Sequence, residues 1–282
     1  MKIKGIFASD IDNTLTNEHH IIPGEVVDYL TSLHEAGWRI VLLTGRTFSF
    51  AVRSFNGLNL PFILGVQNGA EVIRMPEGNV LFQEFLPREI LTDLDKIFNG
   101  HSIGYIVYSG FEGGDFCYYE PHKFSEDMLR YFDRLKSLSS IPWVGVKTHS
   151  EIPDKGFPLV KGFGNKKKLC EIRDQLESLN KFDVCVINDV IDRDKGLLLI
   201  TSRGVNKGNV LKRICQLRGW NCPIVAAGDD ENDIPLFKVA DFSICVKGGS
   251  QRLAEYADLV TESSYNLGVI QGMNQILREH FS

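Results

Sequence analysis

The stretch IFASDIDNTLT, residues 6–16, contains the clearest structural signal in this sequence. Its short apolar run favours a buried strand and ends in Asp10 and Asp12. Residues two apart in a strand point to the same side, so an extended continuation would point both carboxylates the same way. Two such carboxylates repel each other unless a cation or a proton lies between them. Taken alone, the stretch is equally typical of an ordinary turn, because Asp and Asn are common turn formers.

The residues that follow alternate between helix and strand patterns. Helical spacing of apolar residues predicts a helix over 24–36, and continuous apolar runs predict strands over 39–43 and 61–66, with a short helix over 47–55 between them. This alternation indicates a parallel sheet with crossover helices, and strands without alternation fit a sheet that is covered on both faces. The fold class expected is therefore α/β, with a doubly wound, mostly parallel sheet.

The middle of the chain has a different pattern. Between residues 83 and 200 short helices mix with hairpin-like strands, and after residue 204 the first alternation returns with a helix and a buried strand over 222–227. We therefore predict a discontinuous Rossmann-like core formed by 1–82 and 201–282. Residues 83–200 would form a second α/β domain inserted within it.

Composition restricts the possible partners. The 282 residues carry a formal net charge of -5 and are 43% hydrophobic, so a general attraction to nucleic acid or to an anionic membrane is not expected. No apolar run approaches a membrane span, and the first apolar run stops at Asp10, too early for a signal peptide. Six cysteines without a Cys-x-x-Cys pair indicate reduced thiols in a cytoplasmic protein and argue against zinc.

Four polar groups follow apolar strands or begin a helix: Asp10 with Asp12, Thr44, Lys207, and residues 229–233. Ligands of open parallel sheets bind at the carboxyl ends of the strands, where these groups would meet if the strands are neighbours. Several carboxylates suit Mg²⁺, whereas lysine and threonine suit phosphate oxygens. A lysine at a helix start opposes the helix dipole, which favours a phosphate role.

Such a pocket fits phosphoryl transfer. One carboxylate can attack phosphorus and form an aspartyl-phosphate, and a second can act as acid and base. Positioning and charge neutralisation then carry most of the catalysis.

Four motifs in this chain together resemble those of the haloacid dehalogenase superfamily: DIDNT at 10–14, LTGR at 43–46, GVNKG at 204–208 and GDDEND at 228–233. The long insertion between the second and third motifs resembles the Cof-type branch, whose large α/β cap is typical of sugar-phosphate phosphatases. Each motif alone is a weak signal, but four in the family's order span both parts of the predicted core.

The resemblance implies a role for each matching residue. Asp10 would be the nucleophile, and Asp12 would protonate the leaving alkoxide and then activate water. Mg²⁺ would be bound by the Asp10 carboxylate, the Asp12 backbone carbonyl and Asp229, while Asp233 would orient its neighbours. The residues expected to contact the phosphoryl group are Thr44, Gly45, Lys207 and Asn232, with Arg46 as a further possible substrate contact.

Two positions depart from the family pattern. Asn13 stands where family members usually have glycine, and asparagine tolerates unusual backbone angles, so we expect the loop to be retained. Leu199 stands where this branch often has an acid, which leaves the choice of substrate open.

The function expected is a Mg²⁺-dependent phosphatase acting on a small phosphorylated metabolite, with a sugar phosphate as the favoured class. A phosphomutase of the same branch is the first alternative. A phospho-accepting signalling module or a non-catalytic sugar-phosphate-binding protein is a more remote one, since the Asp12 position and the insertion argue against a receiver domain. The sequence does not indicate the oligomeric state.

Overall fold

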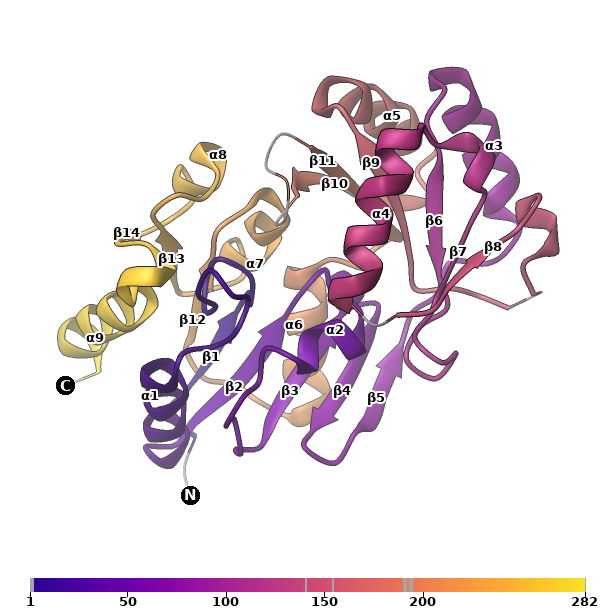
Figure 1. Cartoon of the computed structure of the whole chain (residues 1–282). Helices are drawn as coiled ribbons and strands as arrows, with labels where there is room; N and C mark the ends of the chain where they lie inside the picture. The colour runs from indigo at the N-terminus through magenta and orange to yellow at the C-terminus, as the bar shows by residue number, and fades with distance from the viewer. Residues whose placement is uncertain (1–2, 140, 154, 190–191, 193–194, 282) are drawn as a thin grey trace. The chain divides into compact units, whose positions relative to one another are not determined.

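The computed structural model describes residues 3–139, 141–153, 155–189, 192 and 195–281 (Figure 1). The chain divides into two compact units. The first unit comprises residues 1–44, 51–82 and 206–282, and the second comprises residues 45–50 and 83–205. Each unit has its own sheet.

An eight-stranded sheet forms the centre of the first unit. Neighbouring strands from β14 to β3 pair in parallel, and β3 and β4 pair antiparallel. In sheet order the strands are β14 (Leu259–Thr261), β13 (Phe242–Val246), β12 (Ile224–Gly228), β1 (Gly5–Ser9), β2 (Trp38–Leu43), β3 (Phe62–Val66), β4 (Glu71–Met75) and β5 (Asn79–Gln83). The predicted mostly parallel sheet is thereby confirmed.

Helices cover both faces of this sheet. Figure 1 shows α1 (Gly24–Glu35) and α9 (Gly268–His280) on one face, where Tyr29 of α1 donates a hydrogen bond to Asn274 of α9 at 2.7 Å. On the other face lie α6 (Lys207–Arg218) and α7 (Ile234–Phe237). Burial on both faces explains why β1, β2, β3 and β12 are almost entirely apolar.

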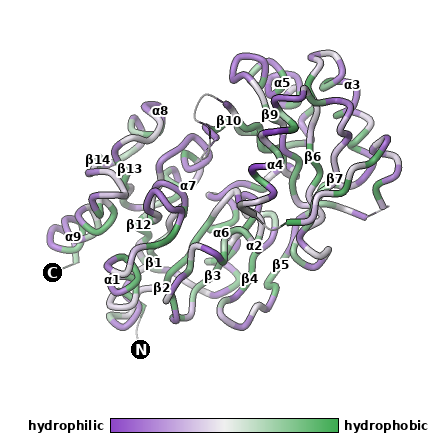
Figure 2. Tube along the Cα trace, viewed as in Figure 1, coloured by the Kyte–Doolittle hydropathy of each residue, from purple (hydrophilic) through white to green (hydrophobic). Residues whose placement is uncertain are grey.

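The shorter helices of the chain lie in its connections. They are α2 (Phe48–Val52), α8 (Gln251–Ala254) and the 3₁₀ turns η1 (Gln67–Gly69), η4 (Glu231–Asp233) and η5 (Ser264–Asn266). Along both sheets in Figure 2, the strands carry mostly hydrophobic residues, whereas hydrophilic residues concentrate in helices and connections.

The second unit contains a six-stranded sheet. Its pairs are antiparallel except for β7 with β8. In sheet order the strands are β10 (Phe182–Asn188), β11 (Gly196–Ser202), β9 (Leu159–Gly164), β6 (Tyr105–Tyr108), β7 (Cys117–Tyr119) and β8 (Trp143–Gly145). The remaining elements are α3 (Ile90–His101), α4 (Glu126–Ser139), α5 (Lys166–Ser178), η2 (Pro121–Lys123) and η3 (His149–Glu151).

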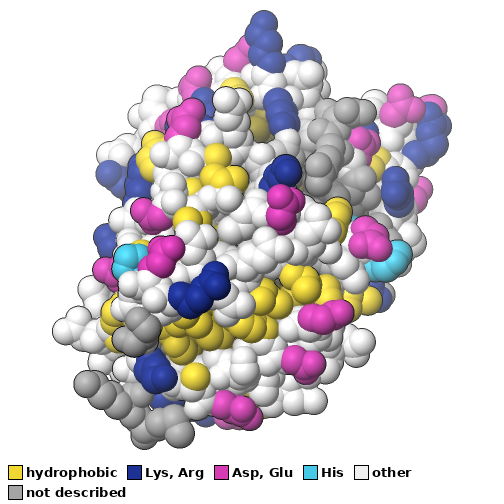
Figure 3. Space-filling model, turned by 90° about the vertical axis from the view of Figure 1, so that its left-hand side faces the viewer, with side chains coloured by type: hydrophobic (Ala, Val, Ile, Leu, Met, Phe, Trp, Pro, Cys, Tyr) yellow, Lys and Arg dark blue, Asp and Glu magenta, His cyan; other side chains and the backbone are white. Residues whose placement is uncertain are grey.

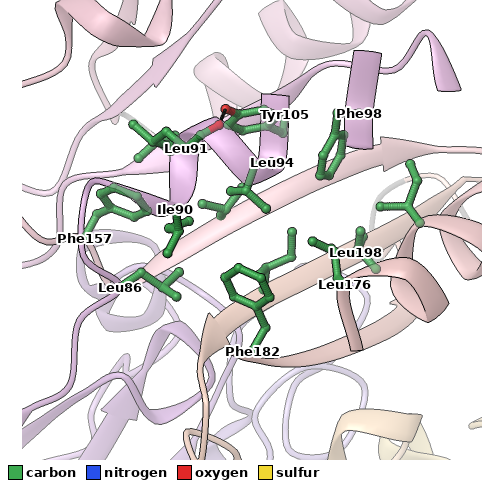
Figure 4. Packing of buried hydrophobic residues seen from close by; sticks show 14 of the residues in the cluster. Leu86, Ile90, Leu91, Leu94, Phe98, Tyr105, Phe157, Leu176, Phe182 and Leu198 are labelled. Atoms are coloured by element: carbon green, nitrogen blue, oxygen red, sulfur yellow. Dashed lines mark hydrogen bonds between the residues drawn. The ribbon is translucent and has the colours of Figure 1, made fainter. Parts of the chain in front are cut away.

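Two apolar layers stabilise the second unit. Residues of α3 and α5 pack with one face of the sheet, and Figure 4 shows Leu94 and Phe98 of α3 near Leu176 of α5 and Leu198 of β11. Tyr131 and Phe132 of α4 belong to the apolar cluster on the other face.

Two strands were not anticipated from the sequence. β9 contains two glycines and a lysine within its six residues, and β14 has three residues, so neither gives a clear periodic signal. β9 nevertheless lies between β11 and β6 within the sheet, because pairing on both sides satisfies its backbone.

Residues 45–50 belong to the second unit through contacts with the loop that precedes β7. The Phe48 and Phe111 rings are 4.2 Å apart, and the Ser49 backbone N–H donates to Asp115 Oδ2 at 2.6 Å. The chain therefore passes between the units at 44/45 and 50/51 as well as at 82/83 and 205/206.

Among the described residues, no helix combines the length and apolar character needed to cross a membrane. On the face drawn in Figure 3, basic and acidic side chains are interspersed and neither sign forms a continuous patch.

Candidate active site

The strand order brings the first and last motifs together. β1 lies between β12 and β2, with Ser9 in register with Ala227 and Leu42. The residues after these three parallel strands therefore emerge at one edge of the sheet. The backbone N–H of Asp10 continues the ladder by donating to the Ala227 carbonyl at 3.0 Å.

A buried lysine connects two of the carboxylates. Lys207, fully buried at the first position of α6, donates to Asp10 and to Asp233 Oδ1, the latter at 2.6 Å. Asp10 is 5% exposed and Asp233 is fully buried. A charged group with so little exposure needs ionic partners, and Lys207 has two.

Asp233 positions the loop that carries Asp229. Its Oδ2 accepts the backbone N–H groups of Asp229 at 3.0 Å and of Asp230 at 3.2 Å, while Oδ1 accepts Lys207. Gly228 permits this arrangement, because a Cβ there would lie 2.5 Å from the Asp233 carboxyl carbon. Both oxygens of Asp233 are thus used within the protein.

Asp10, Asp229 and Asp233 each offer a carboxylate oxygen, and these oxygens lie within 4.8 Å of one another. Burial raises the pKa of Asp10 to about 7, although Lys207 opposes the shift. Burial and the neighbouring carboxylates of Asp10 and Asp233 raise the pKa of Asp229 well above its usual value. For Lys207, burial lowers the pKa, but Asp10 and Asp233 outweigh it and hold that pKa above its ordinary value.

In the loop after Asp10, Asn13 adopts a positive φ of 50°, a conformation that asparagine tolerates better than most residues. Asp12 is buried, with its Oδ1 3.7 Å from His20 Nδ1. Thr14 places its hydroxyl 3.5 Å from Asp229 Oδ1, a contact between residues 215 positions apart that was not predicted from the sequence.

Thr44 and Asn232 are both buried in the first unit. The Thr44 N–H donates to the Gly65 carbonyl at 2.9 Å, and its carbonyl accepts the Asn68 N–H at 2.8 Å. Asn232 Nδ2 lies 3.4 Å from Asn68 Oδ1. Asn68 thus touches two predicted site residues, although it lies outside the four motifs; the Asn-Gly pair directly after a strand is the sequence signal for it.

Gly45 and Arg46 belong to the second unit. A Cβ on Gly45 would lie 3.3 Å from Leu199 Cδ1, so the glycine allows close packing on β11. The Arg46 guanidinium lies 4.1 Å from the centre of the Phe50 ring and donates to the Phe50 carbonyl at 3.3 Å. A substrate contact for Arg46 remains a prediction.

The sequence model of the haloacid dehalogenase-like hydrolases matches residues 7–273. Phosphoglycolate phosphatase 2 of Saccharolobus solfataricus is 24% identical over 98% of this chain and 94% of its own, and phosphatase YwpJ of Bacillus subtilis is 24% identical over 96% and 99%.

Solved structures have the same fold. The HAD subclass IIB sugar phosphatase BT4131 has a TM-score of 0.78 at 20% identity and covers 97% of this chain and 98% of its own. A haloacid dehalogenase-like hydrolase from Bacteroides thetaiotaomicron has a TM-score of 0.75 at 21% identity over 98% and 100%. With nearly its whole length matched, this chain belongs to the family of haloacid dehalogenase-like hydrolases.

Proposed function

We propose that this protein is a Mg²⁺-dependent phosphatase that hydrolyses a small phosphorylated metabolite through an aspartyl-phosphate. The observation that carries the proposal is the group formed by buried Lys207, Asp10 and Asp233 together with the half-buried Asp229. Such a group can bind the charge of a phosphoryl group and hold a nucleophile beside it.

The residues present fit a divalent cation. Three carboxylates against one lysine leave a formal charge of -2 when all are ionised, which a divalent cation would neutralise. Because both oxygens of Asp233 already accept protein donors, the Asp10 and Asp229 carboxylates and the Asp12 carbonyl are the ligands that we assign. Oxygen donors of this kind suit Mg²⁺, which when bound would supply positive charge to the phosphoryl oxygens.

In the first step, an Asp10 carboxylate oxygen attacks phosphorus and the bond between phosphorus and the leaving oxygen breaks. Asp12 gives its proton to that oxygen, so the alcohol leaves neutral. In the second step, Asp12 takes a proton from water, the resulting oxygen attacks phosphorus, and the bond to Asp10 breaks. Inorganic phosphate leaves and both carboxyl groups return to their starting states.

Four residues are assigned to the phosphoryl oxygens: Thr44, Gly45, Lys207 and Asn232. Lys207 suits this role because α6 fixes its Cα while its ammonium donates to two carboxylates, which orients it without removing its charge. Asp233 orients Lys207 and the Asp229 loop and does not touch substrate.

We propose that the inserted domain, residues 83–200, chooses the substrate for the core formed by 1–82 and 201–282. A sugar phosphate is the favoured class, in keeping with the name of the structural relative BT4131. Phosphoglycolate is the second candidate, because several curated relatives, including the one from Saccharolobus solfataricus, are named phosphoglycolate phosphatases.

Phosphate release from a panel of sugar phosphates, 2-phosphoglycolate, nucleotides and pyridoxal phosphate, with Mg²⁺ and with EDTA, tests this proposal. We expect turnover that requires Mg²⁺ and concentrates on one chemical group. Turnover that persists in EDTA would contradict the metal assignment. If the folded protein turns over no member of the panel, the proposed phosphatase activity is contradicted.

A further inference from the structure

The turn that follows β3 has an unusual backbone. Gln67, Asn68 and Gly69 have φ values of 53°, 60° and 95°. Only glycine enters this left-handed region without cost, so two consecutive residues with side chains are held there by their surroundings. Backbone of this kind concentrates at functional sites.

The turn contacts three segments that carry predicted site residues. The Asn68 N–H donates to the Thr44 carbonyl at 2.8 Å, and Asn68 Oδ1 lies 3.4 Å from Asn232 Nδ2. Gly69 packs on Val210, three residues after Lys207, so closely that a Cβ on Gly69 would lie 2.6 Å from Val210 Cγ2. All of these residues belong to the first unit.

The neighbouring Gln67 is fully buried, and neither polar atom of its side-chain amide has a hydrogen-bond partner within the described part of the chain. Buried polar groups are normally paired, so this turn is not arranged for stability alone. Strained backbone persists only where the surrounding structure over-determines it.

We propose that Asn68 is a positioning residue of the phosphate site: its N–H holds Thr44 and its side-chain oxygen orients the Asn232 amide. An amide NH₂ has two donors, so when Asn68 accepts one, the other is available to a phosphoryl oxygen. The 3.4 Å separation is long, and such contacts tighten when the ligand binds. This inference rests on the proposed function.

Asparagine suits this position for two reasons. It tolerates the positive φ better than most residues, and it supplies a neutral acceptor for Asn232. The two properties are separable: Asn68→Gly keeps the backbone conformation and the N–H to Thr44 but removes the acceptor, whereas Asn68→Asp keeps an acceptor.

A double-mutant cycle with Asn232→Ala tests the assignment. We expect Asn68→Gly to lower kcat/KM about tenfold in the wild-type background, and less than about twofold in the Asn232→Ala background, because the shared contact is already lost. In the Asn68→Asp background, Asn232→Ala is expected to lower kcat/KM by the same factor as in the wild-type background. Equal fold losses from Asn68→Gly in both backgrounds, or no loss in either, would overturn the positioning role.

The same cycle is measured without turnover as the rise in Tm caused by inorganic phosphate in the presence of Mg²⁺. A wild-type protein that neither releases nor binds phosphate would contradict the proposed function and this inference together. A wild-type protein that does both, with additive effects of the two substitutions, would contradict the role of Asn68 alone. The Tm without phosphate shows whether Asn68→Gly is folded.

Discussion

Two groups of acidic side chains in this protein each contain a lysine but differ in how fully their carboxylates are paired. In the first unit, Asp10, Asp229 and Asp233 bring ligand oxygens within 4.8 Å of one another, and Lys207 donates to two of them, Asp10 and Asp233. We call these four residues the Lys207 cluster. It has more carboxylates than cations.

In the second unit, Asp95, Glu120 and His149 satisfy the same distance criterion. His149 Nδ1 lies 3.1 Å from Asp95 Oδ1 and 2.9 Å from Glu120 Oε1. Lys123 Nζ lies 3.2 Å and 3.0 Å from the same two carboxylates, and the Tyr105 hydroxyl donates to Asp95 at 2.9 Å. We call these five residues the Asp95 cluster.

The carboxyl pKa values separate the two clusters. Burial raises the pKa of Asp10 to about 7, and one lysine does not offset it. Burial also raises the pKa of Asp95, but hydrogen bonds with His149 and Tyr105 outweigh it and lower that pKa to about 2. The carboxylates of the Asp95 cluster are paired with a lysine, a histidine and a tyrosine, whereas those of the Lys207 cluster outnumber their single lysine by three to one. Proximity of acids is therefore a weaker sign of a site than uncompensated charge.

The largest expected effect separates the clusters by activity. Asp10→Asn is expected to lower kcat by about 10⁴-fold or more, because the amide is not a nucleophile toward phosphorus. Asp95→Asn makes the same chemical change in the other cluster and is expected to leave kcat within about twofold. Steady-state phosphate release measures both; an active Asp10→Asn variant would contradict the nucleophile assignment.

Removing the lysine is expected to have the next largest effect. Lys207→Met leaves buried carboxylates without their cation and is expected to destabilise the fold by about 3 kcal/mol, within the range for broken buried ion pairs. Lys123→Met in the more exposed Asp95 cluster is expected to cost about 1 kcal/mol. Urea unfolding measures the free energy of unfolding of the two variants. Equal losses of this free energy would show that the lysine contributes equally to the two clusters.

Metal binding is expected to stabilise only through the Lys207 cluster. Mg²⁺ at a hundred times its Kd is expected to stabilise the wild-type protein by about 2.7 kcal/mol and to raise its Tm accordingly. Asp229→Asn should abolish most of this rise, and Asp95→Asn should retain it. A full Mg²⁺ response in Asp229→Asn, measured by thermal unfolding, is incompatible with the ligand assignment.

The smallest effect depends on pH. The folded-state pKa of Asp95 lies below the value of about 3.8 expected for the unfolded chain, so its ionised form contributes stability above about pH 4. That contribution is lost as the pH falls toward 2. Asp95→Asn is therefore expected to cost about 0.5–1 kcal/mol at pH 7, since Asp95 is 35% exposed, and progressively less below pH 4.

The unfolding free energies of wild type and Asp95→Asn, followed from pH 7 to pH 3, measure this dependence. Other groups that titrate alike in both proteins cancel in the difference. A difference that stays constant over this range would show that folding does not lower the pKa of Asp95.

Much of the core was predictable because its signals are local. The apolar runs of β1, β2 and β12 are continuous, and each ends in polar residues. These strands, and the edge of the sheet at which the site residues lie, could therefore be predicted from the sequence. β9, with two glycines, and β14, with three residues, have no clear sequence pattern of their own and acquire their structure from the strands beside them.

By itself the sequence determined the α/β class, the four motifs and the acid-rich chemistry, because each of these depends on residue type and short spacing. Only the tertiary structure decided which groups are charge-balanced and which are not. It joined Lys207 to Asp10 across 197 positions and Asn232 to Asn68 across 164. Contacts over such separations leave no local pattern, because they arise from strand order and packing rather than from neighbouring residues.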